Sequence, residues 1–329
     1  RTFLAGFSIA LAILIFIIAV EKQNSKLMWF IAGFVSGLAF FIQPNSISLV
    51  ISAILFLIIN KNCKSSILIF TAGIFTVILL LMFRNTLADA PLLSFSNKGP
   101  EEFASGNILE SSGVGWSEFQ KSGEYSRKYD NLLSVMYNVV KDSITSDFFG
   151  YLKLLANKTA ACFNNFEIPN NYNFLYFKSQ KIRFLNFMFI NFGVIFMFGC
   201  AGITAIMQSL FIGTNKSPQT LITAKDRNLL LFYLLNLLLF ALSIIAFYIL
   251  SRFRFPVLVL LTPLAGYGIY SICLSLLKFT NILKTAAVLI ITILAGLFSF
   301  YFPVKGLNYN YDNAMAYAND AAAYLELNN

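Results

Sequence analysis

The sequence predicts an all-α integral membrane protein with about eight transmembrane helices and one large outer-face loop region that contains amphipathic helices. Hydrophobic residues make up 58% of the 329 residues and charged residues only 12%, whereas a soluble domain is about half apolar and a quarter charged. The apolar residues also come in blocks. Residues 2–20, 229–250 and 257–277 carry no charge, and about 20 such residues, rising about 1.5 Å each, cross a hydrocarbon core of about 30 Å.

Eight apolar segments fit this description, two of them short. The expected spans are 2–20, 27–42, 46–60, 67–83, 185–212, 229–250, 257–277 and 285–302. The short pair meets at Gln43-Pro44-Asn45, which we interpret as a turn because Pro44 has no amide hydrogen to donate within a helix.

Basic residues are unevenly divided between the two sides that this arrangement creates. One side carries nine: Lys22, Lys26, Lys61, Lys64, Lys216, Lys225, Arg227, Lys278 and Lys284. The short links on the other side carry only Arg252 and Arg254. Since cytoplasmic loops are enriched in Lys and Arg, the first side is predicted to be cytoplasmic.

Four regions follow from this topology. Transmembrane helices are expected in 1–83 and in 185–306, and an extracytoplasmic loop region with interfacial helices is expected in 84–184. Residues 307–329 are expected to form an outer-face helical tail, a possible start of a repeat region. The loop region, to about Asp130, is rich in Gly, Ser and Asn and is interpreted as loop. Apolar residues then recur at helical spacing in Leu132–Ile144 and Phe148–Leu155, which predicts two amphipathic helices on the membrane surface or on the span ends.

Composition excludes several classes of site. The chain has no His, so a His base, a His-centred triad and most zinc sites are excluded within it. The net charge of +9 comes from Lys and Arg at helix ends rather than on one face, which argues against nucleic acid as a partner. No CxxC pair and no dense carboxylate cluster occurs, so a divalent metal is unsupported and no metal site is predicted.

Two sets of arginines are candidates for binding phosphate on the outer side. Arg252 and Arg254 lie in the segment SRFRFP, and guanidinium groups bind phosphate through paired hydrogen bonds. The alternative is that both side chains snorkel to lipid headgroups. Arg84, next to Asn85, lies where the span 67–83 leaves the membrane, and its alternative role is that of an interfacial anchor.

Two further segments carry polar candidates. Gly106 and Asn107 lie in a glycine-rich stretch where the backbone can approach a ligand closely, although glycines also occur in ordinary outer loops. Glu167 and Asn170 lie in FEIPNN, and a carboxylate among aromatic residues near a membrane can act as an acid or base. The alternative for Glu167 is a solvated or ion-paired carboxylate.

Taken in order, four motifs resemble the bacterial C-type membrane glycosyltransferases, the superfamily of protein O-mannosyltransferases and aminoarabinose transferases. The most similar branch often carries tetratricopeptide repeats. The motifs are IAGFVSGLAFFIQPN (31–45), RN followed by SNKG and GN (84–107), NKTAACFNNFEIPNNYNF (157–174) and SRFRFPVLVLLTPLAGYG (251–268). Two positions depart from the branch: Gln43 replaces its usual Arg, and Leu260 stands where its second Pro is expected.

The resemblance implies a glycosyltransferase of the bacterial cytoplasmic membrane, with 84–184 facing the periplasm or exterior. It would take a sugar from a polyprenyl-phosphate donor and pass it to a lipid, glycan or protein acceptor. The donor phosphate would be held by Arg252, Arg254 and Arg84. The cleft would be shaped by Asn85, Gly106, Asn107 and Asn170, and Glu167 would have a supporting acid role. The catalytic carboxylate is expected in a first outer loop before residue 1, so the chain is interpreted as a fragment.

Three alternatives stay open. One is a lipid-linked glycan flippase. The expected spans hold no Asp, Glu, Lys or Arg in their interiors, which argues against ion coupling but not against lipid flipping. A second is an O-antigen polymerase or ligase type of enzyme. The third is a non-catalytic membrane subunit of an envelope assembly, with protein partners through the tail.

Overall fold

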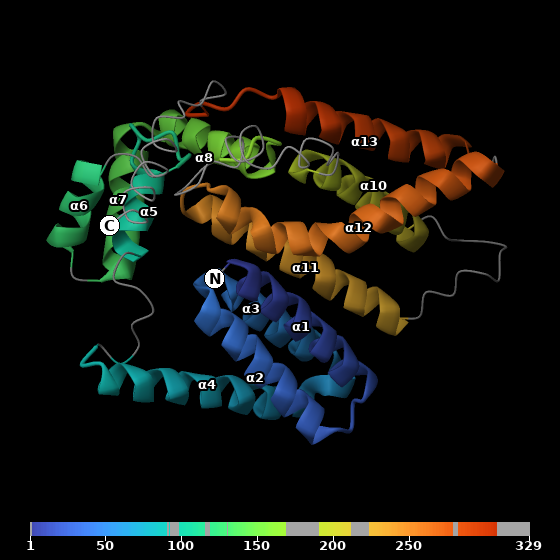
Figure 1. The fold of residues 1–329 in the computed structure, drawn as a ribbon, viewed down its shortest axis with the longest axis horizontal. Coiled ribbons are helices and arrows are strands. Elements are labelled where there is room, and N and C mark those ends of the chain that lie inside the picture. Colours follow the sequence, from blue (N-terminus) through green and yellow to red (C-terminus); the bar gives the residue numbers. More distant parts are fainter. Residues whose placement is uncertain are drawn as a thin grey trace, which may run out of the picture.

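A computed structural model describes residues 2–90, 92, 99–115, 119–129, 131–168, 191–211, 224–278 and 282–307. Figure 1 shows long helices lying roughly side by side, with a group of shorter helices at one end. We call that end, which carries α5 to α8, the outer end, and the opposite end the inner end. The all-α membrane architecture expected from the sequence is confirmed.

The apolar helices agree closely with the predicted spans. They are α1 (Thr2–Glu21), α2 (Lys26–Ile42), α3 (Ile47–Ile59), α4 (Ile67–Leu87), α10 (Phe192–Phe211), α11 (Ala224–Ala246), α12 (Ser251–Lys278) and α13 (Ile282–Tyr301). Within the described residues, six of them are long and apolar enough to cross a membrane, while α2 and α3 are shorter. The short pair is joined by a single 3-10 turn, Pro44–Ser46, so Pro44 ends α2 as predicted.

Five helix boundaries differ from the prediction by four residues or more, and two of these, the end of α4 at Leu87 and the start of α11 at Ala224, extend the expected spans. The helix α10 begins at Phe192 rather than at 185, and residues 185–190 lie outside the described part of the chain. The helix α11 ends at Ala246, four residues early, because the chain bends at residue 247 and Ile249 pairs with the outer loop instead of continuing the helix. The helix α12 starts at Ser251 instead of 257. It contains two prolines, Pro256 in its second turn and Pro263 further along. Arg252 and Arg254 therefore belong to a helix.

The outer region contains four helices in its described part. The predicted amphipathic pair is present as α7 (Leu132–Ser146) and α8 (Phe148–Phe163), each begun by a side-chain cap, from Asn131 and Asp147. The first half of this region was predicted to be loop, and that prediction is wrong. It holds α5 (Gly99–Asn107) and α6 (Phe119–Lys128), whose glycines and polar residues are compatible with helix because α5 packs against α7.

Small residues let the long helices approach closely. A Cβ added at Gly33 of α2 would lie 1.9 Å from the carbonyl oxygen of Phe70 in α4. A Cβ added at Gly268 of α12 would lie 2.2 Å from the carbonyl oxygen of Phe198 in α10. Glycine at such crossings brings backbones into van der Waals contact, which is a main source of helix association in membranes.

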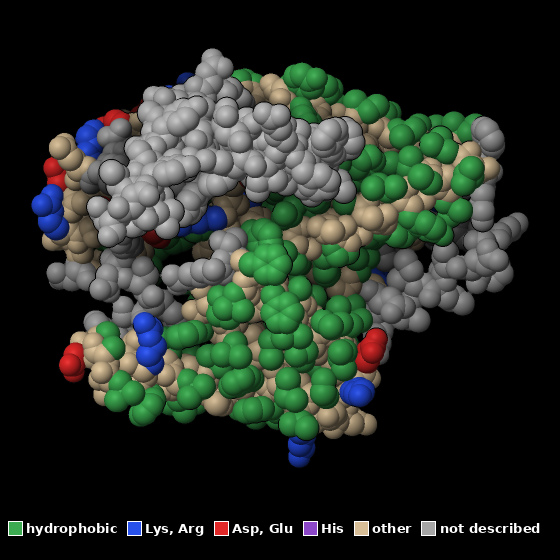
Figure 2. Space-filling view, in the orientation of Figure 1, with side chains coloured by type: hydrophobic (Ala, Val, Ile, Leu, Met, Phe, Trp, Pro, Cys, Tyr) green, Lys and Arg blue, Asp and Glu red, His purple; other side chains and the backbone are tan. Residues whose placement is uncertain are grey.

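The helix bundle has two halves, α1 to α4 and α10 to α13, and they are joined by contacts of α1 with α12 and of α3 with α11. In the second contact the Ser52 hydroxyl donates to the Asn236 side-chain oxygen over 2.7 Å, with both residues fully buried. The outward faces are apolar instead, as Figure 2 shows over the lower helices. Exposed examples include Leu68, Phe75, Ile282 and Leu283, and such a surface fits a lipid environment.

Helix ends that were predicted to share a side of the membrane do contact each other. Asn228, at the start of α11, donates to Asn60 after α3 over 2.6 Å, and Gln208 of α10 donates to the carbonyl of Lys284 in α13 over 3.2 Å. Both contacts lie at the inner end. At the outer end, Ser299 of α13 donates to the carbonyl of Phe163 in α8 over 2.7 Å. The alternating path of the chain is thus the predicted one.

We expect Gly268→Ala to lower the thermal unfolding temperature of the purified protein in detergent, because the new methyl group must push α10 and α12 apart. Overpacking of this kind costs about 1–3 kcal/mol. Gly266→Ala is the matched control, since its Cβ would meet nothing within 4 Å. Both changes carry the same gain in helix propensity, so equal unfolding temperatures for the two variants would contradict the close crossing.

Candidate functional site

The outer end of α12 is built around Arg254, whose side chain is buried although it is charged. It is 1% exposed. Its guanidinium donates to the carbonyls of Asn164 and Phe166, the latter over 2.7 Å, and to the Ser251 hydroxyl over 2.9 Å. It also approaches the carbonyl of Ala161 at 3.5 Å and lies over the ring of Phe192. The free carbonyls at the end of α8 are thereby satisfied by a cation from α12.

Glu167 is the acidic partner of this arginine. Its carboxylate lies 3.6 Å from the Arg254 guanidinium and its side chain is 31% exposed. Ile168, the next residue, also contacts the start of α12, because its carbonyl accepts a hydrogen bond from the Ser251 amide over 3.4 Å. The start of α12 and residues 164–168 are therefore one packed unit, in which Glu167 is ion-paired and still accessible from one side.

Arg252 has the opposite environment. Its side chain is exposed, and its guanidinium lies 4.8 Å from the ring centroid of its neighbour Phe253. It also makes a hydrogen bond to Tyr248, which in turn contacts Glu102 of α5. Burial, followed by the effect of Glu102, raises the pKa of Tyr248 to about 12. Arg252 is thus held in place by neighbours while its guanidinium faces the outer side.

Residues 247–250 connect these groups to the outer loop. Ile249 exchanges two backbone hydrogen bonds with the loop, donating to Gly113 over 2.9 Å and accepting from Gly115 over 3.0 Å. Both glycines have positive φ, of 71° and 67°, a conformation that favours glycine. The glycine-rich stretch singled out from the sequence is therefore used to pair the outer loop with the link between α11 and α12.

Gly106 and Asn107 fix α5 on the end of α11. A Cβ at Gly106 would lie 2.6 Å from the carbonyl oxygen of Phe247. Asn107 is buried, and its amide nitrogen donates to the carbonyls of Phe103 and Ala246, each over 2.8 Å. Its side-chain oxygen accepts from the Lys158 ammonium over 3.1 Å. Asn107 thus acts as a connector of three helices, α5, α8 and α11.

Lys158 is the second buried cation of the outer end. It is 0% exposed and also donates to the carbonyl of Ala246, the last residue of α11, over 3.3 Å. No carboxylate accepts from it among its described hydrogen bonds. Desolvation lowers its pKa from 10.5 to about 7. Because burial disfavours the charged form of an amine, this lysine changes its charge near neutral pH.

The other predicted residues lie elsewhere. Arg84 is exposed at the outer end of α4, where its guanidinium approaches the Asn85 side-chain oxygen at 3.4 Å and the ring of Phe41. Asn85 is buried and donates to the carbonyl of Leu92 over 2.9 Å. In Figure 1 that end of α4 stands apart from the start of α12. Asn170 lies outside the described residues, as does the tail 308–329.

Sequence reasoning overlooked three members of this region: Lys158, Tyr248 and Glu102. Lys158 was visible within the motif NKTAAC, where a lysine falls on the buried face of an amphipathic helix. Tyr248 gave no signal, since it lay inside an apolar run that was assigned to a span. Glu102 lay in a region that was interpreted as loop. Among the described residues, no three or more potential metal ligands gather.

Comparison with known proteins bears on the transmembrane part. Residues 4–85 match the family model of the dolichyl-phosphate-mannose-protein mannosyltransferases. The match supports a C-type membrane glycosyltransferase. It covers α1 to α4 up to Arg84 and Asn85. No curated protein and no solved structure matches the chain. The glycosyltransferase resemblance found in the sequence is therefore supported independently over the first four spans.

We expect the stability of the outer end to rise as the pH increases from about 7 to 10.5. In this window the unfolded chain keeps the Lys158 proton that the folded protein has released, so raising the pH favours folding; below about pH 7 both states are protonated. The measurement is thermal unfolding in detergent, for the wild type and for Lys158→Met. It covers about pH 6.5 to 9.5, a range that starts near the lowered pKa of ~7. The wild type should gain stability relative to Lys158→Met as the pH rises, because only the wild type carries the titrating amine, and a pH-independent difference between the two would contradict the assignment.

Proposed function

We propose that this protein transfers a sugar from a polyprenyl-phosphate-linked donor to a lipid, glycan or protein acceptor on the outer face of a bacterial cytoplasmic membrane. The observation that carries the proposal is the match of residues 4–85 to mannosyltransferases named for dolichyl-phosphate-mannose, which is a lipid-phosphate-linked sugar. The exposed guanidinium of Arg252 at the outer end of α12 supports it, because a cation is needed where the lipid phosphate would lie.

Arg252 is assigned to the donor phosphate, whereas Arg84, at the end of α4 that stands apart from the start of α12 in Figure 1, is not assigned to the same phosphate. Arg254 belongs to the same motif, but its guanidinium already contacts four protein oxygens besides Glu167. We therefore assign Arg254 to positioning: it holds residues 164–168 and the start of α12, and through the latter it orients Arg252. Glu167 supports this arrangement as the counter-charge.

The reaction is a displacement at the anomeric carbon of the donor. A lone pair of the acceptor forms the new bond to that carbon, a carboxylate accepts the acceptor's proton, and the bond to the phosphate oxygen breaks with its electrons going to the leaving lipid phosphate. Negative charge grows on the phosphate as that bond breaks. A guanidinium at this position stabilises the developing charge, which is the main contribution that the chain's own arginines can make.

Arg252→Gln is expected to weaken binding of polyprenyl-phosphate-mannose about tenfold or more, since a charge-assisted hydrogen bond contributes about 1.5–3 kcal/mol. Its unfolding temperature should stay near that of the wild type because the side chain is exposed. Arg254→Gln should instead lower stability by about 3 kcal/mol by leaving buried carbonyls and Glu167 without their partner. Native mass spectrometry in nanodiscs and thermal unfolding measure the two effects.

Arg127→Gln on α6 is the matched control, because it removes an exposed outer arginine outside the site. Donor binding that is unchanged in Arg252→Gln would contradict the phosphate assignment. Movement of the intact labelled donor across vesicles, with no sugar released to any acceptor, would favour a flippase. Failure of the wild type to bind the donor would favour a non-catalytic subunit.

A further inference from the structure

A polar cavity lies at the inner end of the bundle, far along the helices from the residues discussed above. It has a volume of about 170 Å³ and lies between α10, α12 and α13. The residues that line it are Ala205, Gln208, Ser209, Ser271, Ile272, Ser275, Lys284, Thr285 and Val288. For scale, an engineered cavity of about 150 Å³ holds benzene, so this one has room for a tetrahedral anion.

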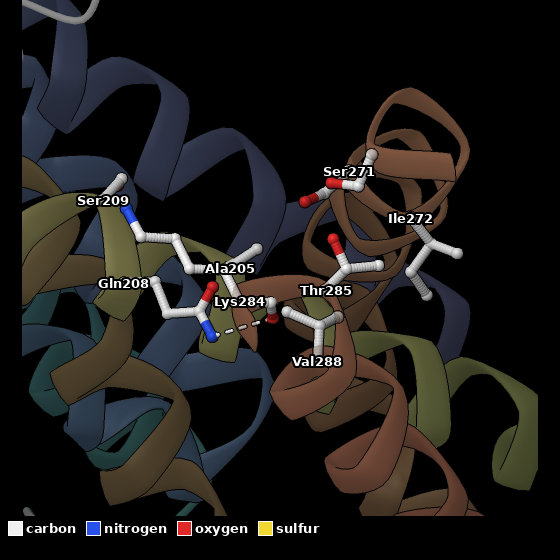
Figure 3. Close-up of a pocket in the computed structure, with 9 residues that line it drawn as sticks. Ala205, Gln208, Ser209, Ser271, Ile272, Lys284, Thr285 and Val288 are labelled. Carbon is white, nitrogen blue, oxygen red and sulfur yellow. Dashed lines mark hydrogen bonds between the residues drawn. The ribbon is translucent and has the colours of Figure 1, made fainter. Parts of the chain in front are cut away.

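The polar groups of the cavity come from three helices and border it from two sides. Figure 3 shows the Thr285 hydroxyl directed toward Ser271, while the ammonium end of Lys284 lies beside Ser209. Gln208 is fixed by its hydrogen bond to the carbonyl of Lys284. The lining thus offers one cation, several hydroxyl donors and an amide, and it contains no carboxylate among the described residues. That set of donors matches an oxyanion rather than a metal ion or a sugar alone.

The surroundings of the cavity indicate where such an anion would come from. Large apolar side chains next to it are exposed: Leu276 and Leu277 at the end of α12, and Ile282 and Leu283 at the start of α13. Leu283, immediately before Lys284, is 86% exposed. A polar cavity bordered by exposed leucines and isoleucines suits a ligand with a charged head and hydrocarbon chains.

We infer that this cavity binds the phosphate group of an anionic membrane lipid at the inner end of α10, α12 and α13. Lys284 supplies the positive charge, Ser271, Ser275 and Thr285 supply hydroxyl donors, and the neighbouring leucines and isoleucines contact the acyl chains. Basic residues near a membrane surface attract anionic lipids. The bound lipid would stabilise the packing of α13 on α12, because its phosphate would contact both helices.

The site differs from the proposed donor site in both position and ligand. The donor phosphate is assigned to Arg252 at the outer end, whereas Lys284 lies at the inner end, as the third residue of α13. The two hypotheses therefore fail separately. Loss of donor binding in the Arg252 variant leaves the inner cavity untouched, and loss of lipid retention in a Lys284 variant leaves the outer arginines in place.

The test uses the full chain in phosphatidylcholine nanodiscs that contain phosphatidylglycerol as the anionic probe. Native mass spectrometry counts the phosphatidylglycerol molecules retained after release. We expect Lys284→Gln to lose one tightly retained molecule, with an affinity about tenfold lower, as for a lost charge-assisted hydrogen bond. Ser275→Leu, which fills the cavity without changing charge, should have the same effect. Lys64→Gln, an exposed lysine on the same side, is the matched control.

Three outcomes would overturn the inference. Equal retention in Lys284→Gln, Ser275→Leu and the wild type would show that the cavity holds no lipid. An equal loss in Lys64→Gln would show that only general surface charge matters. A third arm adds inorganic phosphate and glycerol 3-phosphate as competitors: if they displace the retained molecule at concentrations similar to that of the lipid, the cavity binds soluble phosphate and the lipid assignment is wrong.

Discussion

Buried helix ends set the main physical constraint on the outer half of this protein. The last carbonyls of a helix have no partner within the helix, and leaving them buried without donors costs free energy. Here α8 ends against α12, and α11 ends against α5 and α8. Arg254 supplies donors to the first end and Lys158, with Asn107, to the second. The arrangement of the outer helices depends on these two cations, each of which comes from the neighbouring element.

This constraint explains why two arginines of one motif have different environments. Successive residues of a helix are about 100° apart, so positions 252 and 254 lie about 200° apart and point in nearly opposite directions. One of them must face the packed side of α12 if the other faces the outer surface. Arg254 donates to carbonyls at the end of α8, and Arg252 stays exposed beside Tyr248. The separation is thus a consequence of helical geometry together with the position of α8.

Much of the fold could be predicted because the relevant forces act locally. Long uncharged segments indicate spans, Pro44 cannot continue α2, and the spacing of Leu and Val in 132–144 identifies α7. The site could be predicted only in part. The sequence placed residues 251–256 in a link, and without the start of α12 at Ser251 the two arginines could not be assigned to different faces. The sequence analysis also missed the role of Lys158 and the helix α5. Both are held by contacts with residues distant in the sequence, Lys158 with Ala246 and α5 with α7.

The two ends of the bundle use the same kinds of side chain for different purposes. At the outer end, the buried Arg254 and Lys158 contact oxygens of the protein, and their hydrogen-bonding capacity is largely used within the fold, whereas Arg252 stays exposed. At the inner end, Lys284 borders a cavity whose described lining carries no opposite charge. Whether a cation here is structural or can bind a ligand therefore depends on how much of its hydrogen-bonding capacity the fold already uses. Arg254 and Lys158 use theirs on oxygens of the protein, whereas Arg252 is exposed and Lys284 borders a cavity.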